Sequence, residues 1–306
     1  MKKSLFHIAL SLVLLLSIQS LKAQQFNTLW ATGSAVPNGP QQLTKRPDGQ
    51  FRFAGALMQG ELKVMTTEYY QEGVTQFLKP QLIDSYLINN GLNYVPTTDA
   101  NQPGWVVSFK EDTYRFLVDP SSRTIRGELM LPWNELFVAG SAFPGGSNSI
   151  EWDRNAMSPF MRDHNNPYVF TWIGELGVYE DVVEPGRFKL EGQMTWGPRE
   201  MHPFTQDEDI LVASQMRQGG DDTKWHVSQK GNYIITVDLF NETIHAELIA
   251  SAREEETSSI DIPVQGNEIS KQTFYDLSGR RISNPKQGII LYRQADGTIR
   301  KVIKRK

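Results

Sequence analysis

The sequence contains no cysteine and only five histidines among its 306 residues. Without cysteine the chain has no disulfide, no thiol nucleophile, no thiolate ligand for a metal and no thiol for a lipid anchor. No two histidines stand four residues apart, as they do in the common zinc-binding motif. We therefore predict neither a metal site nor a cofactor.

Signs of catalysis are also scarce. The chain has no glycine-rich phosphate loop and no Gly-x-Ser-x-Gly motif. Glycoside hydrolysis needs two carboxyl groups at a set separation, yet only Glu175 lies in a mostly apolar run, without an evident second carboxylate. Residues 207–209 are acidic but lack the spacing of a calcium loop, which favours a solvated loop. Glu191, Asp221 and Asp222 are further candidate carboxylates. We predict that the protein is not an enzyme.

Long apolar runs are absent except for residues 5–18, which follow two lysines and precede Ala23. This order of basic, apolar and small residues is typical of a secretory signal peptide, predicted to span residues 1–23. The run is shorter than the roughly 20 residues that a membrane-spanning helix needs. The formal net charge of -4 gives no general attraction to nucleic acid. We expect an exported protein that is secreted or held at the outer-membrane cell surface.

An internal repeat organises the chain after the signal peptide. Residues 29–37 correspond to residues 136–144, and three further blocks recur in the same order. Four matching blocks in one order indicate two homologous domains, predicted at 26–132 and 133–250. The three further pairs of blocks are 105–110 with 225–230, 114–119 with 233–238, and 125–128 with 244–247.

Short runs of alternating apolar and polar residues predict an all-β fold. About seven such runs in roughly 110 residues, separated by turn residues, are typical of a two-sheet β-sandwich of immunoglobulin-like size. We therefore expect two tandem immunoglobulin-like sandwiches. The predicted strands are 50–54, 60–65, 105–109, 113–118 and 124–129 in the first copy, and 136–140, 169–174, 187–191, 232–238 and 243–249 in the second. The last two are expected to form a closing hairpin.

One predicted strand, residues 187–191, carries a candidate ligand site. The alternation places Phe188 and Leu190 in the core and Arg187, Lys189 and Glu191 on the solvent face. Trp196 follows seven residues after Lys189, and a cation beside an exposed indole suits a polyhydroxylated, flat-faced ligand. The alternative is a surface lysine and a tryptophan that caps the core.

The second copy resembles the carbohydrate-binding domains of the SusE/SusF outer-membrane proteins of Bacteroidetes starch-utilisation systems. The likeness rests on the order and spacing of several motifs and covers nearly all of residues 135–250, and more loosely 28–130. The motifs are residues 136–142, 150–153, 169–176, 186–190 with Trp196, 219–225 and the closing hairpin. The resemblance implies non-catalytic immunoglobulin-like sandwiches that bind glucan chains at the cell surface.

The resemblance also implies particular site residues. Binding platforms of this family combine aromatic residues with a basic residue on the strand that here holds Lys189. Trp152, Lys189 and Trp196 are the principal candidates, and Trp225 and Asp222 come after them. Trp172 is assigned to the core because it alternates with Phe170, whereas for Trp225, repeated as Trp105, a core role and a ligand role both stay open.

In the first copy, Lys63 aligns with Lys189 and Tyr70 aligns with Trp196, but nothing replaces Trp152. A weaker site of Lys63, Tyr69 and Tyr70 and a role as a mere spacer are equally good interpretations.

The remainder of the chain changes character. Residues 251–271 are polar and predict a linker. Residues 272–306 resemble a carboxy-terminal sorting domain of the type IX secretion route, with Tyr275-Asp276-Leu277 followed by Gly279-Arg280 and a lysine-rich final strand. This resemblance implies export across the outer membrane and attachment at the surface without a lipid anchor. The alternative is a small basic β-module that packs on the second domain.

Together these features predict a non-catalytic cell-surface protein that binds a polysaccharide or oligosaccharide through surface aromatic residues. The resemblance favours starch or another α-glucan as the ligand, and other outer-membrane glycan-uptake proteins are candidate partners. The competing hypothesis is a structural or adhesive surface protein whose sandwiches act as spacers or bind other proteins.

Overall fold

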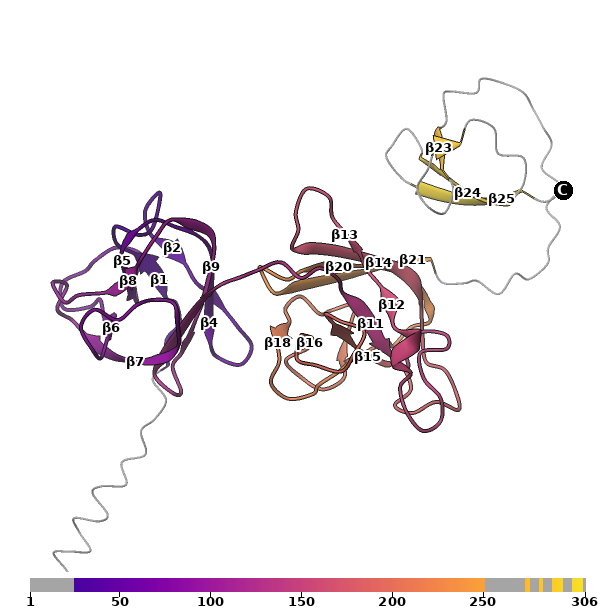
Figure 1. Ribbon diagram of the computed structural model, residues 1–306, viewed down its shortest axis with the longest axis horizontal. Coiled ribbons are helices and arrows are strands. Elements are labelled where there is room, and N and C mark those ends of the chain that lie inside the picture. Colours follow the sequence, from indigo (N-terminus) through magenta and orange to yellow (C-terminus); the bar gives the residue numbers. More distant parts are fainter. Residues whose placement is uncertain (1–24, 251–272, 276–280, 283–287, 294–298, 305–306) are drawn as a thin grey trace, which may run out of the picture. The chain divides into compact units, whose positions relative to one another are not determined.

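The computed structural model describes residues 25–250 and the backbone of four strands between residues 273 and 304 (Figure 1). The predicted signal peptide, 1–23, and linker, 251–271, lie outside the described residues. In the described part, every regular element is a strand except one short 3-10 helix, η1 (Arg154–Ala156). The all-β prediction is confirmed. None of the described helices is long and apolar enough to cross a membrane.

The N-terminal sheet pair contains β1 to β10. One sheet has the order β2-β1-β5-β6-β7, with β8 paired to β5, and the other has the order β10-β9-β4-β3. The two sheets meet along one edge, where Ile88 bridges Gly127 and the backbone N–H of Tyr94 donates to the carbonyl of Arg123. This pair is therefore nearly barrel-shaped. Its strands are β1 (Trp30–Thr32), β2 (Gln41–Gln42), β3 (Thr44–Lys45), β4 (Phe51–Leu57), β5 (Gly60–Met65), β6 (Phe77–Pro80), β7 (Asn89–Thr97), β8 (Trp105–Val107), β9 (Glu111–Asp119) and β10 (Thr124–Leu129).

The C-terminal sheet pair contains β11 to β21. One sheet has the order β12-β11-β15-β16-β18, with β19 paired to both β15 and β17, and the other has the order β13-β14-β20-β21. Its strands are β11 (Phe137–Gly140), β12 (Ser158–Pro159), β13 (Met161–Arg162), β14 (Val169–Leu176), β15 (Arg187–Glu191), β16 (Glu200–His202), β17 (Glu208–Asp209), β18 (Arg217–Gln218), β19 (Trp225–His226), β20 (Gly231–Asp238) and β21 (Thr243–Ala250).

The two sheet pairs have corresponding strand orders. In the first copy β5 lies between β1 and β8, and in the second copy β15 lies between β11 and β19. Trp105 is opposite Leu62 in one sheet, and Trp225 is opposite Phe188 in the other. All four side chains are fully buried, each pair in its own hydrophobic cluster. Each sheet pair therefore has a separate core.

Both sheet pairs belong to one compact unit of the chain. A second unit, residues 254–306, contains a small antiparallel sheet with the order β23-β22-β24-β25. This sheet lies within the predicted C-terminal module, 272–306. Its strands are β22 (Thr273–Tyr275), β23 (Arg281–Ile282), β24 (Gly288–Arg293) and β25 (Ile299–Lys304).

Strands with clear alternation were predicted well. The predicted ranges 60–65, 124–129 and 187–191 match β5, β10 and β15, and β20 and β21 form the closing hairpin. The sequence pattern missed β7, which contains Gly91 and Pro96 and is mostly exposed, so it shows no apolar alternation. It also missed β6 and most of the two- and three-residue strands, which are too short to establish a period, although the predicted range 105–109 contains β8.

Candidate functional site

Strand β15 supplies the floor of the candidate site. Phe188 and Leu190 are fully buried in the core, as predicted. The prediction that Lys189 and Glu191 lie on an open solvent face is wrong, because these side chains are 6% and 0% exposed. The reason is that β15 is a central strand, and the segments around Trp196 and Asp222 cover its outer face.

Two tryptophans form the upper part of the site. Trp196 lies in the loop between β15 and β16, and 44% of it is exposed. Trp152 is half-buried, bridges Ser147 and precedes η1, whose first turn is capped by the carboxylate of Asp153. The two ring centroids lie 6.4 Å apart, with 53° between the ring planes. The structure thus brings together two tryptophans that are 44 residues apart in the sequence.

Each indole has a lysine over its ring. The Lys189 ammonium lies 5.4 Å from the Trp196 ring centroid, and the Lys224 ammonium lies 5.5 Å from that of Trp152. Cation–π contacts of this kind contribute about 0.5–2 kcal/mol each, depending on how far they are desolvated. They help to hold the rings in place before a ligand arrives.

Asp222 joins the two lysines. Its Oδ1 lies 3.3 Å from the Nζ of Lys189, and its Oδ2 lies 3.1 Å from the Nζ of Lys224. Partial burial opposes ionisation of Asp222, but its contacts with Lys224 and Lys189 hold its pKa below the usual value. Asp222 therefore stays ionised and fixes the two cations, and through them the two indoles.

Lys189 also contacts Glu191 at 3.1 Å and Glu200 at 3.2 Å. Burial acts against the charge of Lys189, but its carboxylate neighbours, Glu191 foremost, raise its pKa. The site therefore contains at least as many carboxylates as ammonium groups. Its lysines are occupied in ion pairs, which suits an uncharged ligand better than an anionic one.

Glu191 is the fully buried carboxyl of this cluster. Burial raises its pKa to about 7, although Lys189 acts in the opposite direction. The Lys189 ammonium forms an ion pair with Oε1 of Glu191 but no hydrogen bond to it. Oε2 of Glu191 accepts a hydrogen bond from the side-chain amide of Gln193. Because the pKa in the folded protein lies above the ordinary 4.5, the stability that Glu191 contributes is complete below about pH 4.5 and is lost as the pH rises through about 7.

We expect Glu191→Gln to unfold with a weaker pH dependence than the wild type between about pH 5 and about pH 8, because glutamine cannot ionise. At about pH 8, ionisation of Glu191 lowers the free energy of unfolding of the wild type by on the order of 3 kcal/mol, a loss that Glu191→Gln does not have. Thermal unfolding across a pH series measures it, with Glu180→Gln, an exposed glutamate, as the control. Parallel pH profiles for the wild type and Glu191→Gln would contradict the assignment.

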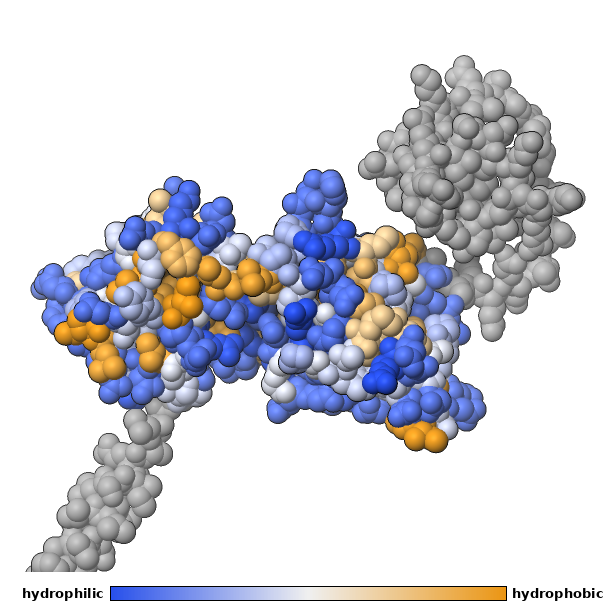
Figure 2. Space-filling model, in the orientation of Figure 1, coloured by the Kyte–Doolittle hydropathy of each residue, from blue (hydrophilic) through white to orange (hydrophobic). Residues whose placement is uncertain are grey.

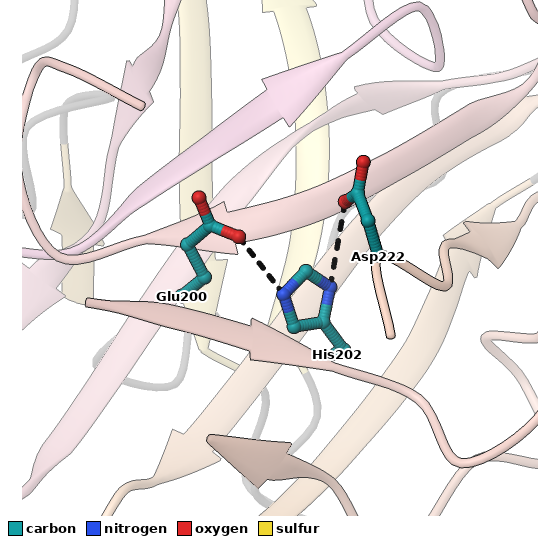
Figure 3. A group of neighbouring side chains, drawn as sticks. All are labelled: Glu200, His202 and Asp222. Atoms are coloured by element: carbon teal, nitrogen blue, oxygen red, sulfur yellow. Dashed lines mark hydrogen bonds and ion pairs between the residues drawn. The ribbon is translucent and has the colours of Figure 1, made fainter. Parts of the chain in front are cut away.

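His202 is buried between two carboxylates, as Figure 3 shows. Its Nε2 lies 3.0 Å from Oε2 of Glu200, and its Nδ1 lies 2.9 Å from the carbonyl of Thr223 and 3.8 Å from Oδ1 of Asp222. One oxygen or nitrogen of each of Glu200, His202 and Asp222 lies within 4.8 Å of the others, a separation that suits a metal ion. However, the carboxylates face opposite ring nitrogens and share the Lys189 ammonium. We interpret the cluster as an ion-pair network that supports the site.

Trp225 does not belong to the site. It is fully buried and stacks on Phe188, with ring centroids 5.6 Å apart. The prediction of a ligand role for Trp225 is corrected, because a ring inside the core has no free face for a ligand. Trp172 is also in the core, at 4% exposure, as predicted.

In the N-terminal sheet pair, Lys63 and Tyr70 both lie next to Phe77. The Lys63 ammonium is 6.0 Å from the Phe77 ring centroid, and the Tyr70 ring is 6.0 Å from it. The Lys63 ammonium also donates to the carbonyl of Ala100. Tyr69 and Tyr70 are exposed, but Phe77 is buried and offers no second platform. The aromatic pair of the second copy has no counterpart in this arrangement.

The structure therefore brings together four of the predicted site residues, Trp152, Lys189, Trp196 and Asp222. The predictions did not include Lys224, Glu200 or His202. Lys224 lies in the motif 219–225, which carries the family resemblance. Its place two residues after the predicted site residue Asp222 could have indicated it as a site residue. Glu200 and His202 lie outside the repeated blocks and outside the motifs found in the sequence, so no pattern pointed to them.

Comparison with known proteins adds little to this geometry. No family model matches the chain, and no curated protein matches it. Among solved structures, SusF from Bacteroides thetaiotaomicron is similar to 92% of this chain and 72% of its own, with 12% sequence identity and a TM-score of 0.34. A likeness this distant indicates neither family membership nor function.

Proposed function

We propose that this protein is a non-catalytic glycan-binding protein whose ligand lies on Trp152 and Trp196. The observation that carries the proposal is the pair of inclined indoles, each held by a lysine and linked through Asp222. Sugar rings have an apolar face that packs on an indole and hydroxyl edges that hydrogen-bond to neighbouring polar groups. Two inclined rings suit two adjacent sugars of a curved chain.

The expected affinity is modest. One sugar stacked on one indole hides on the order of 100 Å², worth about 2–3 kcal/mol before the cost of ordering the ligand. One such platform gives roughly millimolar binding, and two adjacent platforms give more. Affinity at this level suits a surface protein that holds a polymer through many weak contacts.

Catalysis is not part of the proposal. The three carboxylates of the ion-pair network, Glu191, Glu200 and Asp222, are engaged by Lys189, Lys224 or His202. A glycosidase instead needs one carboxyl free to protonate the leaving oxygen and a second on the opposite side of the bond. The ion pairs suit a fixed platform.

The proposal extends to the whole chain. We infer that the two sheet pairs correspond to immunoglobulin-like domains at 26–132 and 133–250, with the C-terminal module directing the exported protein to the outer-membrane cell surface. The resemblance of the sequence to SusE/SusF proteins makes starch the first ligand to test. The first domain then acts as a spacer or as a weaker site at Lys63 and Tyr70.

Affinity electrophoresis tests the proposal. In native gels containing starch or a soluble β-glucan, we expect at least one polymer to slow the protein relative to a gel without glycan. Unchanged migration in every glycan would contradict the proposed function.

A second candidate function is a protein-binding or adhesive role. Apolar side chains are exposed on the N-terminal sheet pair, and Figure 2 shows apolar surface gathered there. Leu82 is 69% exposed, Ile83 76% and Tyr86 57%. An exposed apolar surface of this kind is typical of a contact with another protein. It favours the adhesive hypothesis if no glycan slows the protein.

A further inference from the structure

An open groove lies between the two sheet pairs, close to the site formed by Trp152 and Trp196, here called the tryptophan site. Its volume is about 510 Å³, within the roughly 300–1,000 Å³ typical of ligand pockets. Pro198 and Gly219 form part of its wall. Pro198 follows Trp196 by two residues, and the Gly219 N–H donates to the carbonyl of Glu200 (3.0 Å). The groove and the tryptophan site therefore share the loop around Trp196 and strand β16.

The walls of the groove are fixed by a buried carboxylate. Glu242, from the turn between β20 and β21, is 2% exposed and contacts three guanidinium groups at 3.3 to 3.5 Å. These belong to Arg46, Arg52 and Arg115, all from the N-terminal sheet pair. Arg115 also donates to the carbonyl of Leu239. Because these contacts already exist, a ligand does not have to order the groove when it binds.

Several groups on the walls still have hydrogen bonds to give. Within the described residues, the exposed side chains of Arg126 and Asn90 have no polar partner. The side-chain oxygen of Gln218 accepts a hydrogen bond from Arg115. The side-chain N–H groups of Gln218 have no partner among the described residues. Apolar side chains lie beside these donors, namely those of Ile88 and Leu117.

We infer that this groove is a second subsite for the same glycan, into which the chain extends from Trp196. The inference rests on the proposed function. A sugar presents hydroxyl oxygens to donors such as Arg126 and Asn90 and its apolar face to Ile88 and Leu117. Its acceptors also satisfy guanidinium and amide donors that the protein leaves open. The groove therefore lengthens the binding surface beyond the two tryptophans.

Chain length tests the inference. Isothermal titration of the full-length protein compares maltotriose with maltoheptaose, and cellotriose with cellohexaose. For the series that binds, we expect the longer oligomer to bind the wild type about tenfold more tightly, which corresponds to about 1.4 kcal/mol. In the double variant Arg126→Met with Asn90→Ala, this gain should fall to about twofold or less, while the affinity for the trimer stays unchanged.

Arg162→Met is the matched control, because Arg162 is an exposed arginine on β13 that does not line the groove. It should keep the full gain with length. Equal affinity of short and long oligomers for the wild type would overturn the inference, as would a length gain that survives in the double variant. If no oligomer of either series binds the wild type, the proposed function fails and the inference fails with it. Binding of the trimers without a length effect refutes the groove alone.

Discussion

Trp196→Ala should weaken glycan binding at least tenfold and leave the fold intact. The indole supplies a platform worth about 2–3 kcal/mol of gross contact, and most of this is lost with the ring. Nearly half of Trp196 is exposed, and it lies in a loop outside the sheets, so its removal opens no cavity in the core. Binding is measured by affinity electrophoresis over a range of glycan concentrations, and folding by thermal unfolding.

Trp30→Ala is the matched control for this change. Trp30 is a half-buried tryptophan on β1, in the other sheet pair. The same chemical change there should leave glycan binding unaltered. Undiminished binding by Trp196→Ala would remove Trp196 from the site, and an equal loss in both variants would point to a general effect of the substitution.

Trp225→Ala, unlike Trp196→Ala, should strongly lower the free energy of unfolding and remove no contact with the glycan. The side chain is fully buried and stacked on Phe188, so truncation leaves a cavity at the centre of the C-terminal core. Replacing a buried tryptophan by alanine costs about 3–5 kcal/mol. Denaturant unfolding measures the difference from the wild type.

Trp225→Phe tests whether the cost comes from packing. Phenylalanine fills part of the space and still stacks on Phe188, so this variant should recover a large share of the lost stability. Its glycan affinity, measured under conditions where it is folded, should equal that of the wild type. A Trp225→Ala protein with unchanged stability and weakened glycan binding would mean that the ring is a ligand platform after all.

The contrast between Trp196 and Trp225 shows which parts of the fold the sequence could predict. Strands with clear period-two alternation, such as β15, follow from the need to bury one face of a sheet. The same reasoning assigned Lys189 and Glu191 to solvent and failed, because alternation says which face a side chain is on and not what covers that face. The cover comes from loops around Trp196 and Asp222, whose paths depend on contacts distant in the sequence.

The candidate site was predictable in the same limited way. Trp152 was a candidate through the family resemblance, and Trp196 through the resemblance and its place seven residues after Lys189. Their pairing depends on the loop before η1 meeting the loop after β15, which no local pattern specifies. Glu200 and His202 became visible only through the structure, since Glu200 contacts Lys189, His202 contacts Glu200, and neither residue belongs to a motif.

The most direct test is an NMR titration of the indole N–H signals of the protein's seven tryptophans. Single Trp→Phe variants assign the signals, and the glycan that slows the protein most in gels is the titrant. We expect the signals of Trp152 and Trp196 to shift together along one binding curve, while those of Trp172 and Trp225 stay in place. Shifts confined to other tryptophans, or none at saturating glycan, would contradict the account.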